Sequence, residues 1–465
     1  MDDFDAPGLA KRVESLIMNT SAILSPTVQG LMRISLPLML TALSGNFMFL
    51  LDRLILARYS VEAMNAVATA SMGCAIFQFG GVAIASIAEV FVGQHNGAGH
   101  LKKTPEPVWQ MIWFSLSLFL IFWPIATWGA PFLLPPSLYN EGKDFFWWVM
   151  MFGPLMSVIA AISSFFIGRG FVKLVTWVTL AGNLLNAILN LILVFGVEGY
   201  ILPMGAKGSA IATISSQLFQ VIVLAVVFLN KYHRETYDTH KWHIHGATLW
   251  SCLKIGTPSA VNHMVEIAAW ASLFWMTANV GLDCITIQTI GNSTFVFFAF
   301  VTDGIYKGVI AIASNLIGAK KEQLISKLFY SGFKFHCVYM SLFAIPLILS
   351  PNFLIHQFLP GVDVQDPLFQ ESIRVLRFVW MFFVFDGMVW ILAGILTAGG
   401  DTRFIMVINA TGAWLLAIMP IYIAIHYFDV RSSSAWGLCT LYGIGNCIAF
   451  FIRYKSNRWK HEIMG

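Results

Sequence analysis

The stretch LMRISLPLMLTALSGNFMFLLDRLILA, residues 31–57, establishes the class of fold. It is a nearly unbroken run of apolar side chains. A bilayer core about 30 Å thick is crossed by roughly 20 such residues in a helix. Pro37 and Asp52 stand out within this run, as a residue that interrupts helical hydrogen bonding and as an acid at membrane depth. The stretch therefore predicts a membrane-spanning helix with two unusual positions.

The composition of the whole chain agrees with this prediction. Of 465 residues, 57% are hydrophobic and 11% are charged. A soluble globular chain carries roughly 25% charged residues, and a soluble surface needs them, whereas a lipid-facing surface does not. The net charge of +4 is small and spread along the chain, so nucleic acid is not an expected partner.

Twelve segments are long and apolar enough to span a membrane. Short alternating strands, the signature of a membrane barrel, are not seen. We therefore expect an all-α integral membrane protein. The expected spans are 31–57, 62–92, 108–134, 145–168, 173–196, 206–230, 249–280, 284–318, 325–359, 371–398, 403–427 and 432–453.

The loops between these spans differ in positive charge. With a cytosolic N-terminus, 20 of the 28 Lys and Arg residues fall on the cytosolic side and 7 on the outer side, while Lys307 lies within a span. Cytosolic loops carry the excess of positive charge in membrane proteins. We expect a multi-pass protein of the cell (inner) membrane with both termini cytosolic.

The chain also repeats itself. Arg33 to Pro37 resembles Lys254 to Pro258 at a numbering offset of 221, and Gly97-Ala98 matches Gly318-Ala319 at the same offset. A third similarity, between 170–173 and 400–403, has an offset of 230. Six spans were therefore duplicated, and because six is even, both halves have the same orientation.

Parallel repeats with a cleft between them are typical of secondary transporters. We expect two parallel six-helix bundles with a cleft between them. The expected parts are a cytosolic leader (1–30), an amino-terminal bundle (31–230), a cytosolic linker (231–248) and a carboxy-terminal bundle (249–465).

Acids inside the predicted spans are the first candidates for function, because ionisable residues at membrane depth are costly and usually face a cavity or a partner. With a helical rise of about 1.5 Å per residue, Glu266 and Asp386 can share a depth near the membrane midplane. Two carboxylates in one apolar cavity cannot both ionise cheaply, so one is expected to hold a proton or a metal cation. The alternative is that these acids and Asp52 are neutral, hydrogen-bonded structural groups.

Other charged residues in the spans have simpler interpretations. Glu89 lies near the cytosolic end of its span, where we expect it to reach water. Asp303 and Lys307 are four residues apart on one helix, so Asp303 either neutralises Lys307 or joins a cation site.

Polar side chains gather on the fifth and sixth predicted spans. Asn186 and Asn190 are one helical turn apart and can present carbonyl oxygens jointly to a cation; Asn183 and Thr213 are further candidates. Such residues also hold membrane helices together by hydrogen bonds, and the sequence does not separate the two roles. The four histidines of the linker, at 233, 240, 243 and 245, are expected in a solvated loop rather than in a metal site.

Together these motifs resemble the multidrug and toxic compound extrusion family over nearly the whole chain beyond the leader. Each motif is weak alone, but their order and spacing are specific. The motifs are Pro37 followed fifteen residues later by Asp52, Val92 to Gly99, Asn186-x-x-x-Asn190 followed by Phe195-Gly196, Gly208 to Thr213, Pro258 followed by Glu266, and Gly399 to Arg403.

The resemblance implies a V-shaped pair of bundles that exchange Na⁺ or H⁺ for organic, often cationic compounds. Asp52, Asn186, Asn190 and Thr213 then fall on a cation site of the amino-terminal bundle. Glu266 and Asp386 fall on the acidic pair of the carboxy-terminal bundle, where Na⁺ is a possible metal. Asparagine at 190 is similar to the NorM-like branch, since the DinF-like branch has aspartate there.

The resemblance also supports further expectations about site residues, assembly and cargo. Asp303 is carried as a further cation-site candidate and Pro37 as a hinge, although Asp303 and Lys307 depart from the family pattern. We expect a monomer in the lipid bilayer, with no cofactor beyond the coupling ion and no enzymatic activity. The expected cargo is organic small molecules, with aromatic cations favoured because 14% of the residues are aromatic.

Two other functions compete with antiport. A flippase for lipid-linked substrates, from the same superfamily, would favour a strongly basic cleft, and Lys307 is the one lysine that we expect deep in the membrane. An intramembrane aspartyl protease also needs paired carboxylates. The chain lacks a Gly-x-Gly-Asp motif, and an internal duplication does not suit such an enzyme.

Overall fold

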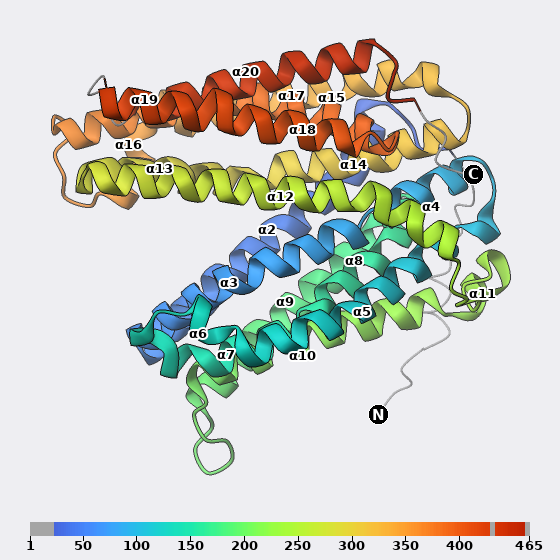
Figure 1. Ribbon diagram of the computed structural model, residues 1–465, viewed down its shortest axis with the longest axis horizontal. Coiled ribbons are helices and arrows are strands. Elements are labelled where there is room, and N and C mark those ends of the chain that lie inside the picture. Colours follow the sequence, from blue (N-terminus) through green and yellow to red (C-terminus); the bar gives the residue numbers. More distant parts are fainter. Residues whose placement is uncertain (1–22, 428–432, 461–465) are drawn as a thin grey trace, which may run out of the picture.

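The computed structural model describes residues 23–427 and 433–460, and this part of the chain is helical apart from turns, short extended connections and one isolated bridge. The helices form two groups that meet at one end and diverge toward the other, as the arms of a V (Figure 1). This confirms the prediction of an all-α membrane protein built from two bundles. The predicted leader lies mostly outside the described residues, and the domain boundaries stay a prediction.

The amino-terminal bundle contains six spans, two of them broken. Its helices are α2 (Val28–Tyr59), α3 (Val61–Ala85) with α4 (Ala88–Gly97), α5 (Pro105–Trp128), α7 (Tyr139–Met151) with α8 (Pro154–Ile167), α9 (Val172–Phe195) and α10 (Gly205–Phe228). The short α6 (Ala130–Leu133) lies between α5 and α7.

The carboxy-terminal bundle follows the same plan. Its helices are α12 (Gly246–Val280), α13 (Leu282–Phe298) with α14 (Phe300–Gly318), α15 (Ile325–Ala344), α16 (Pro351–Phe358), α17 (Pro367–Ala398), α18 (Thr402–Gly412) with α19 (Met419–Tyr427), and α20 (Ser434–Lys455). A π-helical segment, Ala413–Ile418, joins α18 to α19. The predicted span at 325–359 is too long at its end: α15 continues through a π-helical segment, Ile345–Leu349, where the membrane-spanning helix ends, and α16 is a separate short helix after Ser350.

Eleven helical segments of the described chain are long and apolar enough to cross a membrane. The twelfth predicted span is α12, which has the length, at 35 residues, but is not among these eleven. Asn262, His263 and Glu266 lie in its middle and lower its hydropathy. The same polar residues that weaken the membrane signal of α12 are thus the ones that give it chemistry.

The two prolines of the internal repeat occupy equivalent places. Pro37 lies inside α2 and Pro258 lies inside α12, and neither helix ends there. Proline has no N–H to donate to the preceding turn, which makes each site a point of bending. The carbonyl of Pro37 accepts hydrogen bonds from the hydroxyls of Thr41, at 3.0 Å, and Thr176 of α9, at 2.9 Å.

The linker between the bundles is docked, not freely solvated as expected. It forms α11 (Lys231–Tyr237) and then an extended segment that lies along α5. The indoles of Trp109 and Trp113 donate to the carbonyls of Thr239 (2.9 Å) and Trp242 (3.1 Å), and the Gln110 amide donates to the carbonyl of His243 (3.0 Å). The linker therefore belongs mechanically to the amino-terminal bundle.

His233 is the buried member of the linker histidines, and it makes linker docking dependent on pH. Its ring contacts the carbonyl of Val227 at 2.7 Å and packs against Phe165 and Tyr237. Burial, with a smaller contribution from the charge of Arg169, lowers the pKa of His233 from 6.5 to about 4. The undocked linker therefore takes up a proton first. Docking is fully stable above about pH 6.5 and weakens as the pH falls toward 4.

We therefore expect hydrogen exchange of α11 to accelerate between pH 6.5 and 4, after correction for the intrinsic exchange rate. The expected loss of docking free energy is on the order of 3 kcal/mol, at about 1.4 kcal/mol per pKa unit. His233→Phe should remove this acceleration. His240→Gln is the matched control, since His240 is exposed on the same linker, and it should keep the wild-type profile. Equal acceleration in His233→Phe would contradict the assignment.

Candidate functional site

The structure brings the amino-terminal candidates together. Asp52 of α2 lies against α9, where Nδ2 of Asn190 donates to its Oδ1 at 2.9 Å. Nδ2 of Asn190 also lies 3.2 Å from Oδ1 of Asn186, and Nδ2 of Asn186 lies 3.3 Å from Oγ1 of Thr213 on α10. Three helices thus contribute to one buried polar cluster, in which Asn186 and Asn190 are fully buried.

This cluster contains oxygen atoms that could bind a cation. Oδ1 of Asn190 is buried and has no hydrogen-bond partner among the described residues. An unpaired acceptor beside a buried carboxylate provides the oxygen ligands that a hard cation prefers. In the described part of the chain, Asp52 makes no ion pair with Arg53 or Arg58, so its charge is not neutralised at the rim. Asn183 lies elsewhere, with its amide donating to Ser44 at 2.7 Å.

A second cluster lies in the carboxy-terminal bundle, where Glu266 of α12 and Asp386 of α17 line the same cavity of about 40 Å³. The two carboxylates are close enough to repel each other electrostatically. Oδ2 of Asp386 and Oδ1 of Asn262 are buried and have no hydrogen-bond partner among the described residues. The cavity has room for a bare cation or a few waters, but not for a large organic molecule.

Several residues of this cavity were not singled out from the sequence. They are Asn262 and His263 of α12, Tyr306 of α14, Trp390 of α17, Asn409 of α18, and Tyr442 and Asn446 of α20. A sequence signal existed for three of them, because Asn262 and His263 precede Glu266 by one helical turn and Trp390 follows Asp386 by one turn. The residues from α14, α18 and α20 depend on the packing of the bundle.

Asp303 does not line this cavity, although its neighbour Tyr306 does. Oδ2 of Asp303 lies 3.5 Å from Nζ of Lys307, and both side chains are 43% exposed. A charged pair exposed at membrane depth must face water rather than lipid, because a charge in lipid is costly. This ion pair therefore lines a hydrated space.

Glu89 departs from its expected position. It lies in the first turn of α4 and is 5% exposed, so it does not reach water as expected. Its Oε1 has no hydrogen-bond partner among the described residues, and it lies within electrostatic reach of Lys307 and Asp303. The reason is that α4 packs against α14, so the approach of the other bundle covers this end of the span.

The ion pair between Asp303 and Lys307 gives a testable distinction. If the two residues only neutralise each other, Asp303→Asn with Lys307→Met should impair transport less than either single change, since each single change leaves a bare charge. If Asp303 binds the coupling cation, the double variant should lose coupling as fully as Asp303→Asn. The observed geometry favours neutralisation, and a double-mutant cycle on transport rates decides between the two.

Comparison with known proteins gives one consistent picture. The family model MatE matches residues 37–192 and 258–423. These two segments begin at Pro37 and Pro258, which are themselves a matched pair of the internal repeat.

Two curated relatives carry the name "Probable multidrug resistance protein NorM". The one from Mesorhizobium japonicum is 23% identical over 455 residues, covering 93% of each chain. The one from Thermotoga maritima is 22% identical over 420 residues, covering 87% of each chain.

Solved structures show the same fold. A structure described as the outward-facing conformation of a multidrug resistance MATE family transporter has a TM-score of 0.80 at 14% identity and covers 96% of each chain. The crystal structure of the eukaryotic MATE transporter AtDTX14 has a TM-score of 0.77 at 16% identity, covering 92% of this chain and 96% of that one.

Proposed function

The chain belongs to the MatE family, and we therefore propose that it is a secondary active antiporter that exports organic compounds in exchange for Na⁺ or H⁺. Its NorM-named relatives, which it matches over most of their length, place it in the NorM-like branch and support multidrug efflux. Its many apolar helices make it a multi-pass membrane protein. We propose the cell (inner) membrane as its location, with both termini in the cytosol.

The observation that carries the coupling proposal is the cavity of Glu266 and Asp386. Two half-buried acids converge there from α12 and α17, together with two buried acceptor oxygens, Oδ2 of Asp386 and Oδ1 of Asn262, that have no partner among the described residues. Burying this set without a positive charge is unfavourable, since an unpaired acceptor loses its hydration and gains nothing in exchange. A proton or Na⁺ removes that penalty, so the occupancy of this cavity is expected to change the energy of the bundle.

Coupling requires that the cation and the organic compound favour different conformations. A ligand shifts a conformational equilibrium only by its differential affinity for the two states. Because the cavity is too small for a drug-sized molecule, we propose that the cargo binds in the space between the bundles. We propose that the ion pair Asp303–Lys307, whose side chains are 43% exposed at membrane depth, faces that space, and aromatic cations remain the favoured cargo.

The test is transport in proteoliposomes that contain the purified protein, with a fluorescent aromatic cation as cargo. A Na⁺ gradient and a pH gradient are imposed separately. Transport driven by one gradient and abolished by dissipating it supports antiport and names the ion. Asp283→Asn, at the exposed start of α13, is a suitable control variant. Cargo movement that is indifferent to both gradients would contradict the proposal.

A further inference from the structure

The two bundles touch backbone to backbone where α4 of the amino-terminal bundle crosses α14 of the carboxy-terminal bundle. A Cβ added to Gly97 would lie under 3.0 Å from the backbone of Asn315, and one added to Gly318 would lie under 3.0 Å from the backbone of Gln94. No side chain fits at either position without moving a helix. This contact lies at the end that carries the paired lysines 102–103 and 320–321, which we call the basic end.

Hydrogen bonds between side-chain amides and backbone carbonyls cross the same contact in both directions. Nε2 of Gln94 donates to the carbonyl of Ala398 in the other bundle at 2.9 Å. Nδ2 of Asn315 donates to the carbonyl of Gly168 in the opposite direction at 2.7 Å. Both amide side chains are fully buried. A third bond joins Nδ2 of Asn96 to Oδ1 of Asn315 at 2.6 Å.

The two main bonds are related by the internal repeat. The donors Gln94 and Asn315 are related by the offset of 221, as are Gly97 and Gly318. The acceptors Gly168 and Ala398 are related by the other offset of the repeat, 230. Each half therefore donates to the other through the same position of its second span and accepts at the end of its fourth, as in a contact related by two-fold symmetry.

Each acceptor is the carbonyl at the end of a helix, which has no partner within its own helix. After α8, the amide of Gly170 bonds to Ile167; after α17, the amide of Gly400 bonds to Thr397 in the same way. These turns satisfy the neighbouring carbonyls and leave those of Gly168 and Ala398 to the opposite bundle. Gly170 and Gly400 have φ of +81° and +76°, a conformation that favours glycine.

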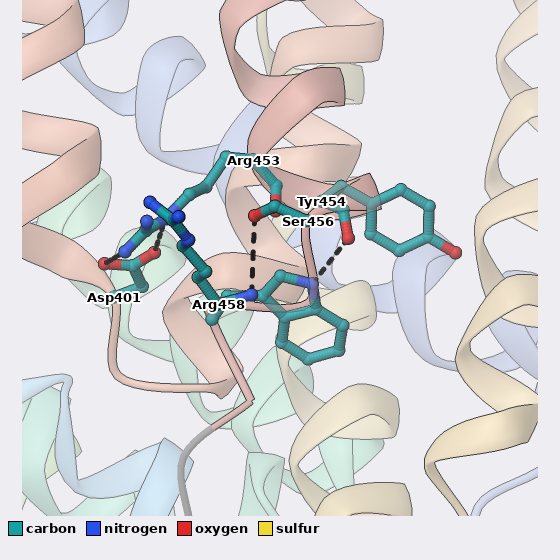
Figure 2. A network of polar contacts seen from close by, with 6 residues as sticks. Asp401, Arg453, Tyr454, Ser456 and Arg458 are labelled. Carbon is teal, nitrogen blue, oxygen red and sulfur yellow. Dashed lines mark hydrogen bonds and ion pairs between the residues drawn. The ribbon is translucent and has the colours of Figure 1, made fainter.

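The turn that carries Ala398 is fixed by side-chain contacts within its own bundle. Asp401 in this turn accepts two bonds from Arg453 of α20, from Nε at 2.6 Å and from Nη2 at 3.2 Å (Figure 2). The Thr402 hydroxyl donates to the carbonyl of Ile255 on α12 at 2.7 Å. The carbonyl of Ala398 is thus held in place by its own bundle. When the bundles separate, we expect the hydrogen bond from Gln94 to break and the turn to stay with the carboxy-terminal bundle.

We propose that Gln94 and Asn315, with the carbonyls of Ala398 and Gly168, form a reciprocal clasp that holds the basic ends of the bundles closed. The clasp releases as a unit when that end opens, because the glycine contact brings both amides to their acceptors together. This inference rests on the proposed transport function for its purpose, since opening at the basic end would expose the space between the bundles to the cytosol.

The test measures the distance between the basic ends directly. Spin labels are placed at Lys103→Cys and Lys321→Cys, which are exposed and lie on opposite bundles, after replacement of the accessible Cys337 and Cys447 by serine. Pulsed dipolar spectroscopy then gives the ratio of separated to closed ends. Gln94→Met and Asn315→Leu each remove a buried hydrogen bond from the closed state. In the open state the same carbonyls bond to water, so the open state loses nothing. Each change should raise that ratio about tenfold, and the double variant should raise it further.

Gln78→Met is the matched control. Nε2 of Gln78 donates to the carbonyl of Val149 at 3.0 Å, a buried bond of the same kind that stays within the amino-terminal bundle, so this variant should keep the wild-type distances. Asn96→Ala, at a partly exposed residue, removes only the third bond and should give a smaller shift in the same direction.

Wild-type distances in the double variant, or an equal shift in Gln78→Met, would overturn the clasp. The measurement needs neither cargo nor an ion gradient. It therefore stands apart from the proteoliposome assay, and failure of the transport proposal would not be mistaken for failure of the clasp.

Discussion

Glu266→Gln and Asp386→Asn are each expected to abolish gradient-driven efflux while leaving the protein folded in the membrane. Each change keeps the size of the side chain and removes one negative charge from the cavity that the two acids share. Losing one of the two carboxylates weakens the attraction for a cation, and we expect about a hundredfold weaker binding of the coupling ion, which corresponds to about 2.8 kcal/mol.

The measurement is cargo transport in proteoliposomes, with protein amount and thermal unfolding recorded for each variant. Asp283→Asn removes a carboxylate from the same bundle at an exposed position and should transport normally. If both cavity variants transport at the wild-type rate, the cavity does not hold the coupling ion.

Asp52→Asn is expected to weaken the dependence of cargo affinity on pH or Na⁺, leaving the part that the cavity of Glu266 and Asp386 contributes. The variant can keep a hydrogen bond to Asn190, so the cluster should remain packed, but it has no charge to lose or gain. In the wild type, binding a cation changes the energy of burying Asp52 against α9 and α10. Pro37, four turns along the same helix, provides the place where α2 bends in response. A tenfold change of affinity would correspond to about 1.4 kcal/mol.

Cargo binding measured against pH and against Na⁺, for the wild type and the variant, tests this expectation. Arg53→Gln is the control that separates a switch from an ion pair at the rim, because it removes the neighbouring charge and leaves Asp52 intact. It should keep the wild-type dependence. Equal curves for the wild type and Asp52→Asn would refute the switch.

The helices could be predicted because lipid imposes a length and a composition on every span. The predicted boundaries of α9 and α10 fall within two residues of the observed ones. The breaks within the membrane-spanning helices were harder to predict. Pro154 marks the break between α7 and α8, but α4 starts after Ser86-Ile87 and α14 after Ala299, with no proline at either break. These breaks arise from how the bundles pack, which a single sequence does not display.

The site was predictable where its residues lie on one helix and less so where they lie on several. Spacing by one turn joined Asn186 to Asn190, and membrane depth joined Glu266 to Asp386. Spacing gave no reason to add Tyr306 to the cavity. Glu89 was predicted to reach water because it lies near the end of its span, and the sequence did not show that α14, from the other half of the chain, covers that end. Gln94 and Asn315 each lie three residues before a matched glycine of the repeat, Gly97 or Gly318. Only the fold shows that each of these amides reaches a helix end of the other bundle.

Antiport at this site requires that cargo displace a cation from the cavity of Glu266 and Asp386, and this displacement can be measured. Purified protein is mixed with an aromatic cation in weakly buffered solution, and the released protons are measured, with displacement of radioactive Na⁺ measured in parallel. We predict release from the wild type and from Asp283→Asn, and a marked loss of release from Glu266→Gln and Asp386→Asn. Undiminished release from both cavity variants would contradict coupling at this cavity.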